Sequence, residues 1–292
     1  MQPSIILDQI SDDLELSMKI AKEHHYSYVE LHNVFGKSIE ECSLRETERI
    51  RSLLRKYDLN VSCLASTVFF LCPLHEGDQV TLFDDSFHAI EGNASTHLRY
   101  LENACRIAGK LHCPRIRIFP FRKPDNRPAP FGTQEDINII LPLMRKALQI
   151  AKAHDITLVL ENCPYSYLPK GMMTIQIINA FDDPHLRMLW DPANSFRADV
   201  ADVPKEYLIF SLMDELRYIY PAIGHIHLKD YHYDPSQKKP FVHKELFKGD
   251  IDYPLLLRFL RKEGYNQALS LEAEVPYEET IRSMDSLYSI LK

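Results

Sequence analysis

The chain has 292 residues, long enough for one large domain or two small ones, and 45% of them are hydrophobic while 26% are charged. Such a composition is typical of a soluble globular protein with a substantial core. The net charge of −7 argues against a nucleic-acid-binding protein, because phosphate binding needs a concentrated basic patch.

Signals for a membrane or for export are not predicted either. No stretch approaches the roughly 18 apolar residues that would span a bilayer. The opening residues Met-Gln-Pro-Ser-Ile-Ile-Leu-Asp show no basic segment followed by an apolar one, so we expect no secretion signal. The six cysteines have no CxxC spacing and are expected to be reduced, mostly buried thiols. We therefore expect a cytoplasmic protein.

Strand-like and helix-like segments alternate along the whole chain. The expected strands are short, apolar and bounded by turn residues, and they cover residues 4–7, 28–32, 60–66, 115–121, 156–161, 186–191, 223–230 and 268–272. The expected helices carry apolar residues at three- and four-residue spacing, and they cover residues 11–25, 38–57, 93–112, 135–154, 174–182, 204–219, 254–264 and 278–291. Because parallel strands need a crossover connection, this alternation predicts a parallel sheet.

The number of strand–helix units matches a (β/α)8, or TIM, barrel. We therefore predict an α/β fold in which residues 1–292 form a single TIM barrel domain. An open doubly wound sheet is the competitor. It is disfavoured because Asp8-Gln9-Ile10-Ser11 stands where a glycine-rich phosphate loop would follow the first strand.

Three of the strand-to-helix connections are long and cover residues 67–92, 122–134 and 231–253. In a barrel these connections emerge at the C-terminal face, which carries active sites, so we expect them to wall a pocket there. Their apolar residues favour packing over the barrel: Phe69, Phe70, Leu71, Phe83, Phe87, Pro124, Pro128, Pro130 and Phe131. Insertions without a role, or a contact between copies of the chain in a homo-oligomer, are the alternatives.

Four of the expected strands end near a side chain that can bind a metal: Glu161, Asp191, His227 and Glu272. Alternate residues of a strand face opposite sides of a sheet. If these four side chains point inward, their apolar neighbours point outward toward the helices on all four strands. The sequence therefore predicts that the four side chains meet at the open end of the barrel.

Three carboxylates packed together repel one another, and at least one of them would be forced to take up a proton. One divalent cation resolves this conflict. Three oxygens and one imidazole nitrogen suit manganese, magnesium or cobalt, with zinc and iron as further candidates. Ion pairs with inward-facing arginines at positions 115, 117 and 187 are the alternative.

These segments resemble the xylose-isomerase-like barrel superfamily, and more closely its sugar phosphate isomerase/epimerase group. The resemblance rests on Val29-Glu30-Leu31, Leu160-Glu161-Asn162, Trp190-Asp191-Pro192-Ala193-Asn194, His225-Ile226-His227-Leu228-Lys229-Asp230, Gly249-Asp250-Ile251-Asp252-Tyr253 and Leu271-Glu272. It implies that Glu161, Asp191, His227 and Glu272 hold one divalent metal ion. It also implies that Glu161 and Glu272 flank a small sugar or polyhydroxy keto substrate and move its protons.

The implied chemistry begins with proton removal next to a carbonyl, which produces a metal-stabilised enediolate. Returning the proton to the neighbouring carbon isomerises the sugar, and returning it to the opposite face epimerises it. Expelling a β-hydroxyl instead makes the enzyme a dehydratase. The residues around the metal ligands therefore decide the reaction.

Around the ligands, Lys229 is a candidate catalytic proton donor, although a salt bridge to Asp230 or Glu274 would explain it equally well. The candidate substrate-binding residues are Glu30, His32, Arg117 and Asn194.

Two positions depart from the epimerases of this group. Asn194 stands where they typically carry histidine, and Tyr167 stands where they carry a second glutamate. An inward Arg117 together with His227-Leu228-Lys229 also resembles the dehydratases of cyclic keto acids in this superfamily, so a dehydratase of a cyclic keto acid or an inosose is the main alternative to an isomerase or epimerase. An apurinic endonuclease is less favoured, because of Asn194 and the negative net charge.

Overall fold

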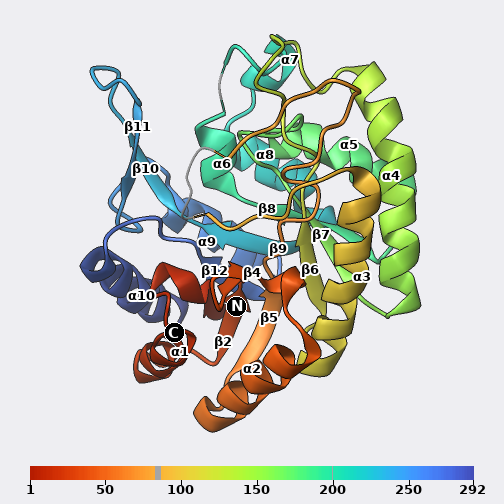
Figure 1. Cartoon of the computed structure of the whole chain (residues 1–292). Coiled ribbons are helices and arrows are strands. Elements are labelled where there is room, and N and C mark those ends of the chain that lie inside the picture. The colour runs from red at the N-terminus through yellow and green to blue at the C-terminus, as the bar shows by residue number, and fades with distance from the viewer. Residues whose placement is uncertain (83–86, 199) are drawn as a thin grey trace.

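Eight parallel strands form a nearly closed barrel in the computed structural model, which describes residues 1–82, 87–198 and 200–292 (Figure 1). The neighbours follow the order β1-β12-β9-β8-β7-β6-β5-β2, and a parallel bridge between Ile6 and Glu30 joins the two ends. The barrel strands are β1 Gln2–Ile5, β2 Tyr28–Leu31, β5 Asn60–Leu64, β6 Arg115–Ile118, β7 Thr157–Glu161, β8 Leu186–Trp190, β9 Ile223–Leu228 and β12 Ala268–Leu271. The predicted α/β TIM barrel is thus confirmed.

Helices surround the strands (Figure 1). The main ones are α1 Leu14–Glu23, α2 Leu44–Tyr57, α3 Ala94–Leu111, α4 Gln134–Ala153, α5 Gly171–Phe181, α8 Leu212–Ile219, α9 Tyr253–Lys262 and α10 Tyr277–Leu291. Two short helices, α6 Pro192–Phe196 and α7 Lys205–Leu208, follow β8.

Two helix predictions are corrected, both because a serine caps the helix at a later start. The predicted helix 38–57 begins only at Leu44, where Ser43 and Glu46 form a reciprocal capping box. The residues before it form a hairpin of β3 Asn33–Val34 and β4 Lys37–Ser38 and a 3-10 turn, Ile39–Glu41. The predicted helix 204–219 divides into α7 and α8, and α8 starts at a second capping box made by Ser211 and Asp214.

A second hairpin lies inside the predicted long loop 231–253. It consists of β10 Asp230–Tyr233 and β11 Phe241–Lys244, paired antiparallel so that Tyr231 lies opposite His243. Figure 1 shows this hairpin projecting away from the barrel. The remaining elements are the 3-10 turns Leu7–Gln9 and Tyr220–Ala222.

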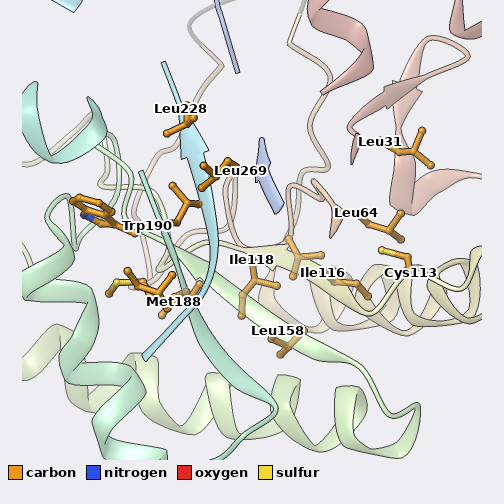
Figure 2. Packing of buried hydrophobic residues seen from close by; sticks show 14 of the residues in the cluster. Leu31, Leu64, Cys113, Ile116, Ile118, Leu158, Met188, Trp190, Leu228 and Leu269 are labelled. Carbon is orange, nitrogen blue, oxygen red and sulfur yellow. The ribbon is translucent and has the colours of Figure 1, made fainter. Parts of the chain in front are cut away.

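Alternation along the strands separates two apolar layers. Outward residues belong to the main core between strands and helices, among them Leu158, Met188, Trp190, Leu228 and Leu269 (Figure 2). The residues between them on the strands face the barrel interior, where Cys63, Val159 and Leu189 form a separate fully buried cluster. The predicted strand parity is therefore confirmed for the apolar positions.

The apolar loop residues pack over the barrel, as the sequence predicted. Phe70, Leu71, Phe119 and Cys163 form a buried cluster against which Phe87 packs, and Phe69 and Phe131 are buried in the main core. Pro124 is buried, whereas Pro128 and Pro130 are exposed. Phe83 lies outside the described residues.

The cysteines also behave as predicted, since all six are buried free thiols. Within the described ranges, no helix combines the length and the apolar character that a membrane crossing requires.

The barrel interior requires a glycine at position 224. A Cβ atom built there would lie 2.6 Å from Cβ of Arg187 and 3.3 Å from Cγ1 of Val159, whereas one built on Gly109 of α3 would meet nothing within 4 Å. We expect Gly224→Ala to lower the free energy of unfolding by about 1–3 kcal/mol through overpacking. The control Gly109→Ala should raise it by about 0.5–1 kcal/mol through helix propensity. Urea denaturation measures both, and equal effects would contradict the close approach of β8 and β9.

Candidate metal centre

The four predicted metal ligands lie together at the carboxyl ends of four barrel strands. Glu161 is the last residue of β7, Asp191 directly follows β8, His227 lies near the end of β9, and Glu272 directly follows β12. One ligand atom from each side chain lies within 4.8 Å of all the others, and all four residues are buried. Parallel strands carry their final residues to one end of a barrel, which explains the convergence.

Asp191 is held by the start of α6. Its Oδ1 accepts the backbone N–H of Asn194 at 2.9 Å as an N-cap, and Pro192 occupies the first helical position. Its own backbone N–H donates to Oδ1 of Asn162 at 2.9 Å. The other oxygen of Asp191, Oδ2, faces Nζ of Lys229 at 3.2 Å.

Glu161 is held by a neutral donor and a charged one. Its Oε1 accepts from Nδ2 of Asn194 at 2.9 Å, and its Oε2 accepts from Nη1 of Arg117 at 3.2 Å. Asn194 also donates to the backbone oxygen of Asn162 at 3.0 Å. The amide of Asn194 therefore fixes the orientation of the Glu161 carboxylate through Oε1.

Arg117 lies buried against the carboxylates. Besides Glu161, its Nη1 reaches Oε1 of Glu272 at 3.5 Å, while Nε and Nη2 donate to the backbone oxygens of Ser66 and Ala65. The ring of Phe119 lies 4.8 Å from its guanidinium carbon. The alternative of ion pairs with inward arginines thus holds for Arg117 but not for the other two. Within the described residues, the guanidinium groups at positions 115 and 187 form no ion pair with a carboxylate.

Lys229 contributes the second positive charge. Its Nζ lies 2.7 Å from Oε2 of Glu272, 3.2 Å from Oδ2 of Asp191 and 3.5 Å from Oε1 of Glu274. Of the two salt bridges considered from the sequence, the structure contains the one with Glu274. Asp230 instead accepts the backbone N–H groups of Tyr231 and Gly249.

The surroundings push the pKa values of the two glutamates in opposite directions. Burial and the negative charge of Glu272 raise the pKa of Glu161 to about 7, although the positive charge of Arg117 lowers it. Burial would also raise the pKa of Glu272, but Lys229, His227 and Arg117 bring it well below its ordinary range. Opposite shifts of neighbouring carboxyls are typical of an acid–base pair.

Glu30 and His32, also predicted to bind substrate, lie on β2 and just past it, and their surroundings differ from each other. Glu30 is fully buried and bonded to His225 and His227. His32 lies just past β2, where its Nδ1 contacts Oδ2 of Asp8 at 2.9 Å and its ring packs 4.8 Å from that of Phe87. Its Nε2 is buried without a hydrogen-bond partner in the part of the chain that the structure describes.

The four residues fit a divalent cation. Among the described residues, Oδ2 of Asp191 and Nδ1 of His227 are buried without a hydrogen-bond partner, and both belong to the cluster. Three carboxylates face the two positive charges of Arg117 and Lys229, so one negative charge remains to be offset by a cation or by a proton on Glu161 or His227, whose pKa values are both raised. Oxygen and imidazole donors together match the preferences of manganese, cobalt, iron and zinc, and the oxygens those of magnesium.

Several residues around the site escaped the sequence analysis. Arg197 donates to the hydroxyl of Tyr231 at 2.8 Å and contacts the hydroxyl of Tyr165, and Tyr231 reaches Oε2 of Glu274 at 3.4 Å. These residues lie in the connections that follow the barrel strands, with Tyr231 on the short strand β10, and the periodicity of the barrel strands does not predict the direction of their side chains. Strand alternation does place His225 on the same inward face as His227, two residues away, but it predicts no role for it.

Comparison with known proteins gives one family and several relatives. A family model described as "Xylose isomerase-like TIM barrel" matches residues 18–290. A human protein named "Putative hydroxypyruvate isomerase" is 23% identical over 207 residues, which are 69% of this chain and 68% of the human protein.

Two solved structures show the same fold. The "probable 3-DHS dehydratase AsbF" of Bacillus anthracis is 15% identical with a TM-score of 0.69, and the match covers 99% of both chains. A 3-keto-D-glucoside 4-epimerase of E. coli is 14% identical with a TM-score of 0.69, and the match covers 99% of this chain and 100% of the epimerase.

The raised pKa of Glu161 predicts a specific pH dependence in protein treated with a chelator. Between the ordinary pKa of 4.5 and about 7, the folded chain binds a proton at Glu161 that the unfolded chain lacks. The stability that this group contributes is therefore lost as the pH rises through that window. We expect the difference in unfolding free energy between wild type and Glu161→Gln to fall by up to about 3 kcal/mol from pH 5 to pH 8.

Urea denaturation across this pH range measures the effect. Glu278→Gln, which changes an exposed carboxylate on α10, serves as the control and should show no such trend. A constant difference between wild type and Glu161→Gln would contradict the raised pKa.

Proposed function

Because the chain belongs to the xylose isomerase-like TIM barrel family, we propose that it is a divalent-metal-dependent isomerase or epimerase of a sugar or sugar phosphate. The reaction proceeds by proton transfer next to a carbonyl. One observation carries the proposal: the buried convergence of Glu161, Asp191, His227 and Glu272 at the end of the barrel where this fold places active sites.

These four residues would hold one divalent cation, with manganese, magnesium or cobalt favoured by the oxygens and zinc or iron as further candidates. When bound, the cation would polarise the carbonyl of the substrate and stabilise the negative charge that develops on its oxygens. The site lies in a protein of negative net charge, which supports a small-molecule substrate over a nucleic acid.

The two glutamates provide the proton-transfer groups. Glu161 would take up the proton of the substrate carbon and return it, while Asn194 and Arg117 fix its orientation. Glu272 stays ionised beside Lys229, whose ammonium group can donate hydrogen bonds to substrate oxygens. Returning the proton to the neighbouring carbon gives isomerisation, and returning it to the opposite face gives epimerisation.

The four residues predicted to bind substrate divide into two groups. Glu30, Arg117 and Asn194 donate to or accept from other protein groups, so we assign them to orienting the carboxylates and His227. His32 has a free Nε2 while Asp8 holds Nδ1, which supports its assignment to a substrate hydroxyl.

A dehydratase of a cyclic keto acid or an inosose is the second candidate, and the position of Lys229 favours it. An ammonium group 2.7 Å from Glu272 could protonate a hydroxyl as it leaves the β-carbon of the substrate. The structural likeness to the Bacillus anthracis protein, named a probable dehydratase, is consistent with this reaction.

The metal site predicts a defined stoichiometry. We expect close to one divalent ion per chain after loading with Mn²⁺, and Glu161→Gln/Glu272→Gln should weaken binding by at least about 100-fold because two charged ligands are lost. Elemental analysis and titration with Mn²⁺ measure stoichiometry and affinity. The control, Glu278→Gln/Glu279→Gln, removes two carboxylates from α10 and should bind like wild type. Equal affinity of the double ligand variant would contradict the site.

The proton-transfer reaction predicts incorporation of solvent deuterium. During turnover in D₂O, the product should gain deuterium at the carbon next to the carbonyl, and Glu161→Gln should lower kcat by about 10²–10⁴-fold because the proton carrier is lost. Keto-sugars, their phosphates, inosose and dehydroshikimate, each with Mn²⁺, are the substrates to screen, with NMR and mass spectrometry as readouts.

Mass separates the two candidate functions. Isomerisation and epimerisation conserve the mass of the substrate apart from the deuterium, whereas dehydration removes one water. Isomerised or epimerised product without deuterium would point to hydride transfer and against the first candidate, whereas a dehydrated product needs no deuterium because β-elimination returns no proton to that carbon.

A further inference from the structure

A buried carboxylate lies inside the barrel next to the metal ligand His227. Glu30 of β2 is 0% exposed, and its two oxygens contact two histidines of β9. Oε1 contacts Nε2 of His225, and Oε2 lies 3.2 Å from Nε2 of His227. One carboxylate is thus shared between the two imidazole rings.

The two nitrogens of His227 face different groups. Nε2 faces Glu30, and Nδ1 lies 3.5 Å from Oε2 of Glu272 without forming a hydrogen bond. An ionised carboxylate only accepts hydrogen bonds, so Nε2 carries the proton in the contact with Glu30. Nδ1 is then the nitrogen that can bind a cation on the side of the carboxylate cluster.

We propose that Glu30 is a positioning residue that fixes the ring orientation and the protonated nitrogen of His227, so that Nδ1 serves as the ligand atom. His225 holds the second oxygen of Glu30 and thereby keeps the carboxylate in place. The inference rests on the proposed function, because it concerns the metal site of that function. It removes Glu30 from direct contact with substrate, which agrees with its lack of exposure.

A second metal ion is the competing explanation, since Glu30, His225 and His227 also form a group of metal-binding side chains. The contacts argue against it. Glu30 and His225 are in direct hydrogen-bond contact, whereas an ion between them would hold each ligand atom about 2 Å from itself.

The physical role of Glu30 is to lower the cost of metal binding. A free imidazole can rotate and can carry its proton on either nitrogen, and both freedoms must be lost when Nδ1 binds a cation. A carboxylate on the opposite nitrogen removes them in advance and makes the ligand more basic. Loss of such a partner typically costs about 10–100-fold in metal affinity.

Glu30→Gln tests the inference with Zn²⁺ affinity as the readout. A glutamine presents one acceptor and one donor, so it can no longer accept from both histidines. We expect Zn²⁺ to bind about 10–100-fold more weakly, measured by competition with a chromophoric chelator. The control is Ser62→Ala, which removes a buried hydrogen bond with Ser4 elsewhere in the barrel interior and should leave the affinity within about threefold of wild type.

The second measurement is ¹⁵N NMR of the histidine rings in the zinc-loaded wild type. It needs no variant, so it decides the matter even if Glu30→Gln fails to fold. We expect Nε2 of His227 to carry a proton and Nδ1 to bind zinc. Zinc bound through Nε2, or wild-type affinity in Glu30→Gln, would overturn the inference.

Two further outcomes separate this inference from its alternatives. Two zinc ions per wild-type chain, with one lost in Glu30→Gln, would overturn it in favour of a second metal ion. If the wild type binds no divalent cation, the proposed function fails. The NMR spectrum of the metal-free protein then tests the positioning alone, and an unprotonated Nε2 of His227 would overturn it.

Discussion

The burial of three carboxylates within a few ångströms of one another is the interaction on which the rest of this structure depends. Glu161, Asp191 and Glu272 repel one another in a site that excludes water, so each negative charge needs a positive partner. Arg117 and Lys229 supply two. The third is offset either by a proton on Glu161 or His227, whose pKa values are both raised, or by a cation bound at Oδ2 of Asp191 and Nδ1 of His227.

The barrel fold holds the three carboxylates close together. Its strands carry the three carboxylates to one end, and the apolar layer between strands and helices keeps them there (Figure 2). The long loops add a second apolar cluster on that side, in which Phe119 stacks on the guanidinium group of Arg117. Exclusion of water strengthens every charge–charge interaction in the cluster, which is what a site for carbanion chemistry needs.

The hydrogen bonds divide the residues of the site into two kinds that the sequence could not distinguish. Side chains with an atom in the cluster that accepts or donates no hydrogen bond, such as Asp191 and His227, are suited to binding. Side chains whose polar atoms bond to other protein groups, such as Arg117, Asn194 and Glu30, are suited to orienting them. Both glutamates contact Arg117, but Glu272 also lies beside the charges of Lys229 and His227. Its pKa is therefore lowered, whereas burial raises the pKa of Glu161.

The amino-acid sequence by itself determined the barrel, the inward and outward faces of its strands, and the meeting of residues 161, 191, 227 and 272. Each of these follows from local periodicity and from the parallel order of the strands. The apolar pattern did not predict the helix start at Leu44, because that start is set by the serine cap at Ser43. Only the tertiary structure decided that Glu30 contacts His225 and His227, or that Lys229 contacts Glu272 and Asp191 rather than Asp230. Parity reports the face on which a side chain lies, but its partner across the barrel depends on the stagger between strands that are distant in the sequence.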